Sequence, residues 1–168
     1  RLYERYFGRP QLVSREAVRK IIAKSATSAA VQKFKLGFLY AEWEELVDAW
    51  QLESWESYRD FNRLGRKTRL PEAQRVALWT VFESVINSVL NQSLITISGM
   101  YARLAQELTA RKHPAFDFVV VDEAQDVSVS QLRFLAALGT NRPNGLFFAG
   151  DLGQRIFQVP FSWSSQGV

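Results

Sequence analysis

Apolar residues recur every three or four positions through much of residues 1–113, a spacing typical of helices with one buried face. Helices are predicted to begin at Ser14, Ser28, Ser54 and Pro71 and after Thr96. Ser and Thr cap helix N-termini, and Pro is favoured in the first helical turn. The first half of the chain is therefore expected to be helical throughout.

The longest helix is predicted to begin at Pro71. Its core face should carry Leu78, Phe82, Val85 and Val89, widened by Trp79, Ile86 and Leu90. The helix from Ser28 should bury Val31, Phe34 and Phe38, and the helix after Thr96 uses Tyr101, Leu104 and Leu108. Trp43, Trp50, Trp55 and Trp79 recur with Leu and Val at helical spacing, which favours core packing over base stacking.

The pattern changes near His113 and Pro114. The run 118–121 is short, aromatic and β-branched, which predicts a parallel strand covered on both faces. A helix is predicted over 131–138, followed by a second buried strand within 145–150. We therefore expect two parts: a mostly helical part, residues 1–113, and an α/β part with parallel strands, residues 114–168.

Both predicted strands end in acids. A strand, helix, strand unit makes the strands parallel, so Asp122, Glu123 and Asp151 are expected to converge at one sheet edge, where ligands bind in open parallel sheets. Two such acids suit a hydrated Mg²⁺ and an attacking water. For the first strand alone, an Asp that only caps the next turn is an equal alternative.

Further polar and aromatic residues follow the second acid. The amide of Gln154 suits detection of a phosphate oxygen. Trp163, and after it Phe161, are candidates for base stacking, with packing on the domain surface as the alternative.

Two segments carry a resemblance to a known family. Asp122-Glu-Ala-Gln-Asp126 resembles the Walker B motif of the UvrD/Rep family of superfamily 1 DNA helicases, and Gly150-Asp-Leu-Gly-Gln-Arg-Ile-Phe157 resembles that family's motif III. The resemblance implies that Asp122 holds the Mg²⁺ of ATP, that Glu123 activates the hydrolytic water and that Gln154 senses the γ-phosphate. It implies supporting roles for Gln125, Asp126 and Asp151.

The resemblance also implies a fold and an activity. Residues 114–168 would be part of a RecA-like P-loop NTPase motor domain, and residues 1–113 a helical insertion that touches single-stranded or duplex DNA. The parent protein would be an ATP-dependent helicase, such as a DNA repair helicase, that steps along single-stranded DNA. The segment after motif III departs from the family pattern, because Gln158-Val-Pro160 precedes Phe161.

One expected part of the nucleotide site is missing from the sequence. No Gly-x-x-x-x-Gly-Lys-Ser/Thr phosphate loop occurs, and Gly65-Arg-Lys-Thr68 has the wrong spacing and follows no strand. With Arg1 in place of an initiator Met, we expect a piece of a longer protein that is inactive by itself. The alternatives are a non-catalytic nucleic-acid- or partner-binding module that keeps the helicase fold, and a motor with another task, as in helicase-nuclease fusions.

Composition and charge set further bounds. With 47% apolar and 13% aromatic residues, the chain is too apolar to be disordered. The absence of Cys excludes disulfides and thiolate metal sites, and the single His113 excludes a His cluster. No apolar run approaches the ~20 residues of a membrane span and no signal peptide is evident, so a cytoplasmic protein is expected.

The net charge is +4, and the whole excess of basic residues lies in residues 1–84. The densest basic run is 59–69, in which Arg66, Lys67 and Arg69 are candidate phosphate contacts to DNA. A solvated loop between two helices is an equal alternative for that run. Oligomeric state is not predicted by any of these features.

Overall fold

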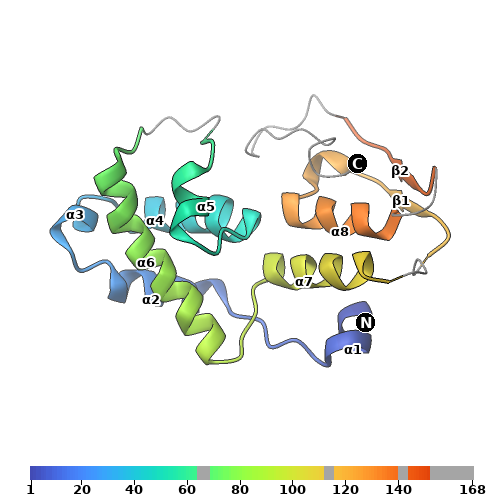
Figure 1. Cartoon of the computed structure of the whole chain (residues 1–168), viewed down its shortest axis with the longest axis horizontal. Helices are drawn as coiled ribbons and strands as arrows, with labels where there is room; N and C mark the ends of the chain where they lie inside the picture. The colour runs from blue at the N-terminus through green and yellow to red at the C-terminus, as the bar shows by residue number, and fades with distance from the viewer. Residues whose placement is uncertain (64–68, 112–115, 140–143, 152–168) are drawn as a thin grey trace. The chain divides into compact units, whose positions relative to one another are not determined.

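The structure is a computed structural model that describes residues 1–63, 69–111, 116–139 and 144–151. The chain divides into two compact units, Arg1–Ile97 and Ser98–Val168. The helices of the first unit are α1 (Leu2–Phe7), α2 (Arg15–Ser25), α3 (Ala29–Gln32), α4 (Leu36–Glu42), the π-helical η1 (Trp43–Asp48), α5 (Trp55–Asp60) and α6 (Glu72–Asn91) (Figure 1).

The second unit combines helices with a small sheet. Its elements are α7 (Ile97–Thr109), which starts at the boundary, β1 (Val119–Val121), the 3₁₀ turn η2 (Ala124–Asp126), α8 (Val129–Gly139) and β2 (Leu146–Phe148). The division lies between Ile97 and Ser98, whereas the change in sequence pattern lies at 113 and 114. The sequence pattern changes where the strands begin, but it does not show which helix packs with them. The helix α7 belongs to the second unit, where its Tyr101 packs on Phe134 of α8 with 5.4 Å between ring centroids.

The predicted helix starts are confirmed with two differences. The Ser14 hydroxyl accepts from the amide of Ala17 at 3.1 Å, and Ser54 forms a reciprocal capping box with Ser57. Pro71 stands one residue before α6 instead of inside it. The single helix predicted from Ser28 is wrong, because 33–35 separate α3 from α4. The helical spacing of Val31, Phe34 and Phe38 continues across this break, so it did not reveal that the helix is interrupted.

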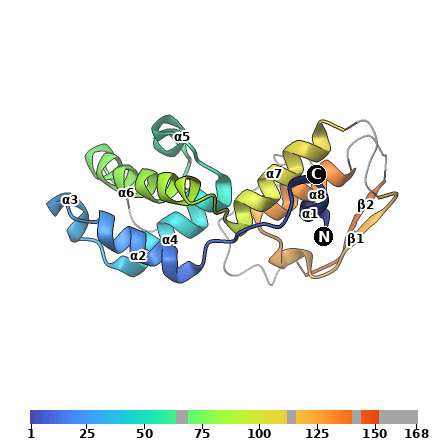
Figure 2. The ribbon, with the colours of Figure 1, turned by 90° about the horizontal axis from the view of Figure 1, so that it is seen from below.

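The core of the first unit is built on α6, which packs against α2, α3 and α5 (Figure 2). The predicted face is confirmed, since the side chains of Leu78, Phe82, Val85 and Val89 are all buried. Leu90 is 66% exposed, so its assignment to this face is wrong. It lies one helical step, about 100°, past Val89 and therefore turns away from the packed side.

Aromatic side chains fill this core. Trp43 packs on Phe82 at 6.1 Å between ring centroids, and Tyr58 stacks on Trp79 at 5.7 Å. Core packing is thus confirmed for Trp43 and Trp79, which are buried, whereas Trp50 and Trp55 are partly exposed.

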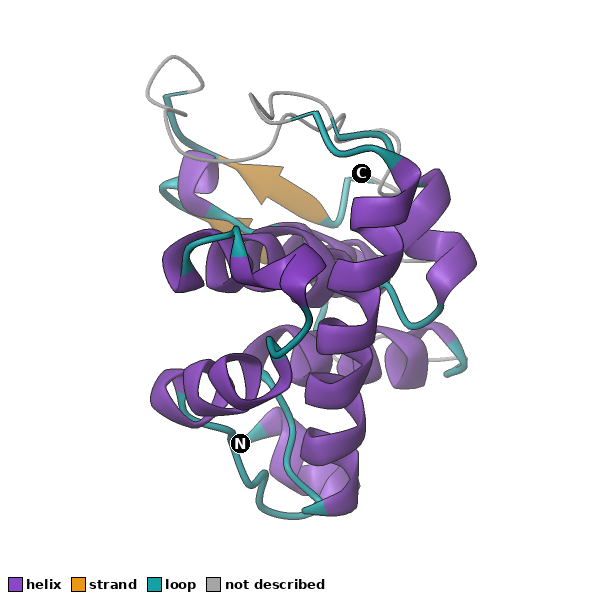
Figure 3. Cartoon of the chain, turned by 90° about the vertical axis from the view of Figure 1, so that its left-hand side faces the viewer, coloured by secondary structure: helices purple, strands orange, loops and turns teal. Residues whose placement is uncertain are grey.

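The two strands form the parallel pair that the sequence predicts. Val119, Val120 and Val121 pair with Leu146, Phe147 and Phe148, and the two strands are the orange arrows of Figure 3. The helix α8 connects the strands and packs on both. Coverage of both faces is a wrong prediction here, because Val120 is 72% and Phe147 is 63% exposed. Their neighbours in the strands are partly buried, since α8 shields one face only.

Within the described residues, no helix is both long enough and apolar enough to cross a membrane.

Candidate active site

The two acids that follow β1 lie at the surface of the second unit. The side chains of Asp122 and Glu123 are both exposed, and the Asp122 carboxylate accepts from the amide of Glu123 at 2.9 Å. Glu123 has left-handed backbone angles, φ 52° and ψ 43°. A non-glycine residue in this region costs about 1–2 kcal/mol, and such residues concentrate at functional sites. The chain then turns immediately into η2.

Gln125 joins this segment to the end of β2. Its side chain is only 5% exposed. Its amide nitrogen donates to the Glu123 carboxylate, and its amide oxygen accepts from the amide of Asp151 at 3.1 Å. One buried amide therefore holds the second acid of the first motif and the backbone of the second motif at the same time.

The backbones of the two segments also meet directly. The amide of Ala149 donates to Val121 at 2.8 Å, and that of Ala124 donates to Ala149 at 2.9 Å, so the ladder continues past the ends of both strands. A Cβ added to Gly150 would stand 2.8 Å from the Ala124 nitrogen and would also collide with the Gln125 side chain. Only glycine fits this approach without a shift.

Two further acids, Asp126 and Asp151, follow the carboxyl ends of the two strands. Asp151 is exposed beside Gly150, and Asp126 is exposed in η2. In the part of the chain that the structure describes, no three His, Cys, Asp or Glu residues group as a metal cluster. Mg²⁺ does not require one, because it is commonly held by one or two carboxylates together with waters and substrate phosphates. An exposed Asp122 fits that donor set.

Several predicted site residues lie outside the described residues. These are Gln154, Phe161 and Trp163 after the second strand, and Arg66 and Lys67 of the basic run. Arg69 is described and is exposed.

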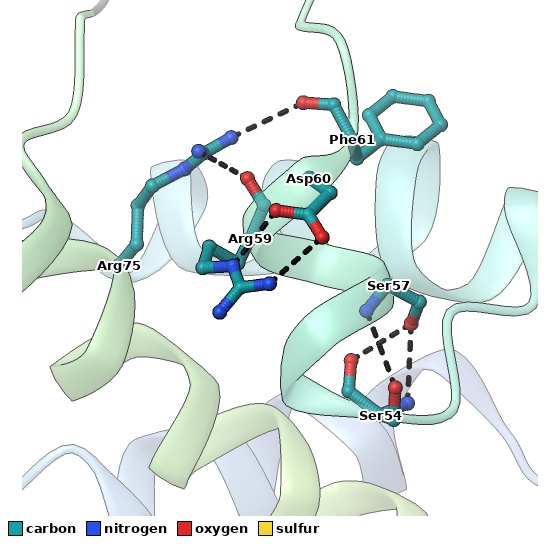
Figure 4. A network of polar contacts seen from close by, with 6 residues as sticks. All are labelled: Ser54, Ser57, Arg59, Asp60, Phe61 and Arg75. Atoms are coloured by element: carbon teal, nitrogen blue, oxygen red, sulfur yellow. Dashed lines mark hydrogen bonds and ion pairs between the residues drawn. The ribbon is translucent and has the colours of Figure 1, made fainter.

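The described part of the basic run is largely engaged within the first unit. Arg59 forms two hydrogen bonds to the carboxylate of its neighbour Asp60, at 2.7 and 2.9 Å (Figure 4). These bonds lower the pKa of Asp60. Arg75 donates to the carbonyl of Phe61 at 3.2 Å, while Arg63 pairs with Glu42.

Glu42 is the residue that the sequence analysis missed. Its side chain is fully buried, and it accepts from the Tyr58 hydroxyl at 3.0 Å and from both terminal nitrogens of Arg63. Burial, together with the charge of Glu42, raises the pKa of Tyr58 well above its ordinary value. The one signal in the sequence was position, because Glu42 stands three residues after Leu39 and four before Leu46 on an apolar face.

The model of the UvrD/REP helicase N-terminal domain matches residues 14–160, which cover most of both units and include both motifs. The chain belongs to this family. The expected resemblance is thereby confirmed, together with a mostly helical chain that carries a small parallel sheet.

A curated relative, an ATP-dependent helicase/nuclease subunit from Lactobacillus johnsonii, is 35% identical over 65 residues. This match covers 39% of the present chain and 5% of the relative, so the chain corresponds to a small part of that protein's length. No solved structure gives a significant match.

Proposed function

We propose that this chain is part of an ATP-dependent DNA helicase or translocase, which couples ATP hydrolysis to movement on single-stranded DNA and to duplex unwinding. Residues 114–168 would contribute to a RecA-like motor domain, and residues 1–113 would form its helical insertion. Family membership supports the helicase assignment. The parallel pair with its crossover helix, and the acids at the carboxyl ends of both strands, support the motor domain.

The two adjacent acids have separate roles in this proposal. Asp122 would hold a hydrated Mg²⁺ bound to ATP, and the ion would neutralise charge on the phosphates. Glu123 would accept a proton from the attacking water as a general base. Gln125 would fix the orientation of Glu123, since it donates to that carboxylate from a buried position. Gln154 as γ-phosphate sensor stays a prediction.

The observation that carries the proposal is the bridge made by Gln125. A structural capping Asp would need no connection to the next strand end. Here the amide of Gln125 holds both the Glu123 carboxylate and the backbone of Asp151. A change in phosphate contacts at the segment of Glu123 would therefore alter the position of the segment of Asp151, and the converse also holds. Coupling of hydrolysis to movement requires such a connection.

The test is ATP turnover by a longer protein that carries this chain. Glu123→Gln keeps the size and hydrogen-bonding capacity of the side chain but removes the base, so kcat should fall by roughly 10²–10⁴-fold while ATP binding persists. Glu53→Gln, which changes an exposed carboxylate of the first unit, is the matched control and should leave turnover unchanged. Unchanged turnover in Glu123→Gln would refute the assigned role and favour a non-catalytic binding module.

A further inference from the structure

The first unit contains a long segment without any acid. Residues 17–41 hold Arg19, Lys20, Lys24, Lys33 and Lys35 but no Asp or Glu. By contrast, acids dominate residues 42–60. The positive charge of this acid-free segment lies on α2 and in the break between α3 and α4, apart from the basic run 59–69.

Within this segment, two lysines flank exposed apolar surface. Lys33 and Lys35 are exposed and lie in the break between α3 and α4, with Phe34 between them. The Phe34 ring stacks on Phe38 of α4, at 5.0 Å between centroids and 18° between planes. Both rings are only partly covered, and Leu36 beside them is 42% exposed. We call Lys33, Phe34, Lys35 and Phe38 the Lys-Phe surface.

The charges of this surface are not neutralised by ion pairs in the described residues. The ammonium of Lys33 lies 5.3 Å from the centroid of the Phe34 ring, and Lys35 pairs with no described carboxylate. Two other cations of the first unit do have carboxylate partners: Lys20 pairs with Glu16 at 2.7 Å, and Arg59 pairs with Asp60 at 2.7 Å. An anion gains more from a cation that has no carboxylate partner.

We propose that the Lys-Phe surface binds single-stranded DNA, with Lys33 and Lys35 on backbone phosphates and the Phe34–Phe38 pair stacking on a base. Alternating cations and aromatic rings are the combination that single strands require, because unpaired bases offer their faces to stacking. A duplex would satisfy the lysines alone. The choice of DNA as partner rests on the proposed function.

The local backbone supports a preformed surface. The Gln32 side chain donates to the carbonyl of Thr27 at 3.0 Å, and the amide of Phe34 donates to Val31 at 2.9 Å. Val31 is itself 1% exposed, so the turn that carries the surface is anchored in the core. A strand that binds here would lose little entropy in ordering the site.

The test is fluorescence anisotropy of a labelled oligothymidylate titrated with the 168-residue chain at several salt concentrations. Lys33→Ala/Lys35→Ala should weaken binding, and the slope of log K against log salt should become shallower by about 0.7 for each phosphate that is no longer bound. Lys20→Ala/Arg59→Ala removes the same number of charges from residues already paired with acids, and should change both quantities much less.

Phe34→Leu separates stacking from charge. It keeps an apolar side chain on Phe38 but removes the aromatic face, so binding should weaken roughly five-fold or more with an unchanged salt slope. Circular dichroism melts of all variants report whether each is folded.

Equal losses in the two double variants would overturn the proposal, because they would show dependence on net charge alone. Equal affinity for a duplex of the same length would overturn the assignment to single strands. Since this measurement needs no nucleotide, it can fail while the Glu123→Gln test succeeds, and the converse also holds.

Discussion

One carboxylate of the first unit and two of the second have opposite surroundings. In the first unit, Glu42 is fully buried and its oxygens are occupied by Tyr58 and Arg63. In the second, Asp122 and Glu123 are exposed while the residue beside them, Gln125, is buried. A carboxylate with all its partners inside the fold serves stability, whereas an exposed one held by a buried neighbour stays available to a ligand.

The largest effect should come from breaking the buried pair. Glu42→Ala leaves the Arg63 guanidinium and the Tyr58 hydroxyl without their acceptor, and removal of one partner of a buried pair costs about 3–5 kcal/mol. Chemical denaturation followed by tryptophan fluorescence measures this, since Trp43 and Trp79 lie in the same core. Arg59→Ala, which breaks only the exposed pair with Asp60, is the control. Equal midpoints for the two variants would contradict a stabilising role for Glu42.

The next effect concerns the close approach at the end of β2. Gly150→Ala should destabilise the second unit by about 1–3 kcal/mol, because the new methyl group collides with the backbone of Ala124. Hydrogen exchange at the amide of Ala149 should accelerate. Gly37→Ala is the control, because Gly37 is a helical glycine with open space around the position of an added methyl group. Its stability should rise slightly. Slow exchange in Gly150→Ala would show that the two motifs do not pack as described.

A smaller loss is expected at the bridging amide. Gln125→Ala removes the acceptor of the Asp151 amide, and a hydrogen bond of this kind contributes about 1 kcal/mol. Exchange of that amide should therefore become roughly five-fold faster. The amide of Val119, which donates to Gly145 at the other end of the sheet, is the internal reference. An unchanged exchange rate at the Asp151 amide would contradict the bridge made by Gln125, on which the proposed function depends.

The smallest effect is a pH dependence of the first unit. The raised pKa of Tyr58 keeps it neutral in the folded state, while in the unfolded chain it loses its proton near pH 10. The contribution of neutral Tyr58 to the free energy of unfolding is complete well below pH 10. It decreases as pH rises, and at pH 10 the loss is about 0.4 kcal/mol. Tyr58→Phe should flatten this alkaline decline in urea denaturation. If stability declined as steeply in Tyr58→Phe as in the wild type, the alkaline decline would come from other groups.

Much of the second unit was predictable because its signals are local. Two short apolar runs that end in acids, with a helix between them, are sufficient to predict the parallel pair and the edge at which the motifs meet. The exposure of Val120 and Phe147 was not predictable from their apolar character, since coverage depends on what packs against the sheet.

The helical unit was less predictable where a residue's role depends on distant partners. Glu42 and Arg63 are 21 residues apart, and nothing in the spacing pairs them. In the run 59–69, Arg66, Lys67 and Arg69 stay candidate DNA contacts, with a solvated loop as an equal alternative, but the sequence did not show that Arg59 and Arg63 pair with Asp60 and Glu42. Helix caps such as Ser14 and Ser54 were predictable because they act within three residues.

The division of labour between the two adjacent acids is tested most directly by a Mg²⁺ titration of ATP turnover in a longer protein that carries this chain. Asp122→Asn should raise the Mg²⁺ concentration needed for half-maximal turnover, because a neutral amide is a weaker ligand for a hard cation. Glu123→Gln should lower kcat by roughly 10²–10⁴-fold and leave that concentration unchanged. The same response of both variants to Mg²⁺, or wild-type turnover in either, would contradict the separate roles of Asp122 and Glu123.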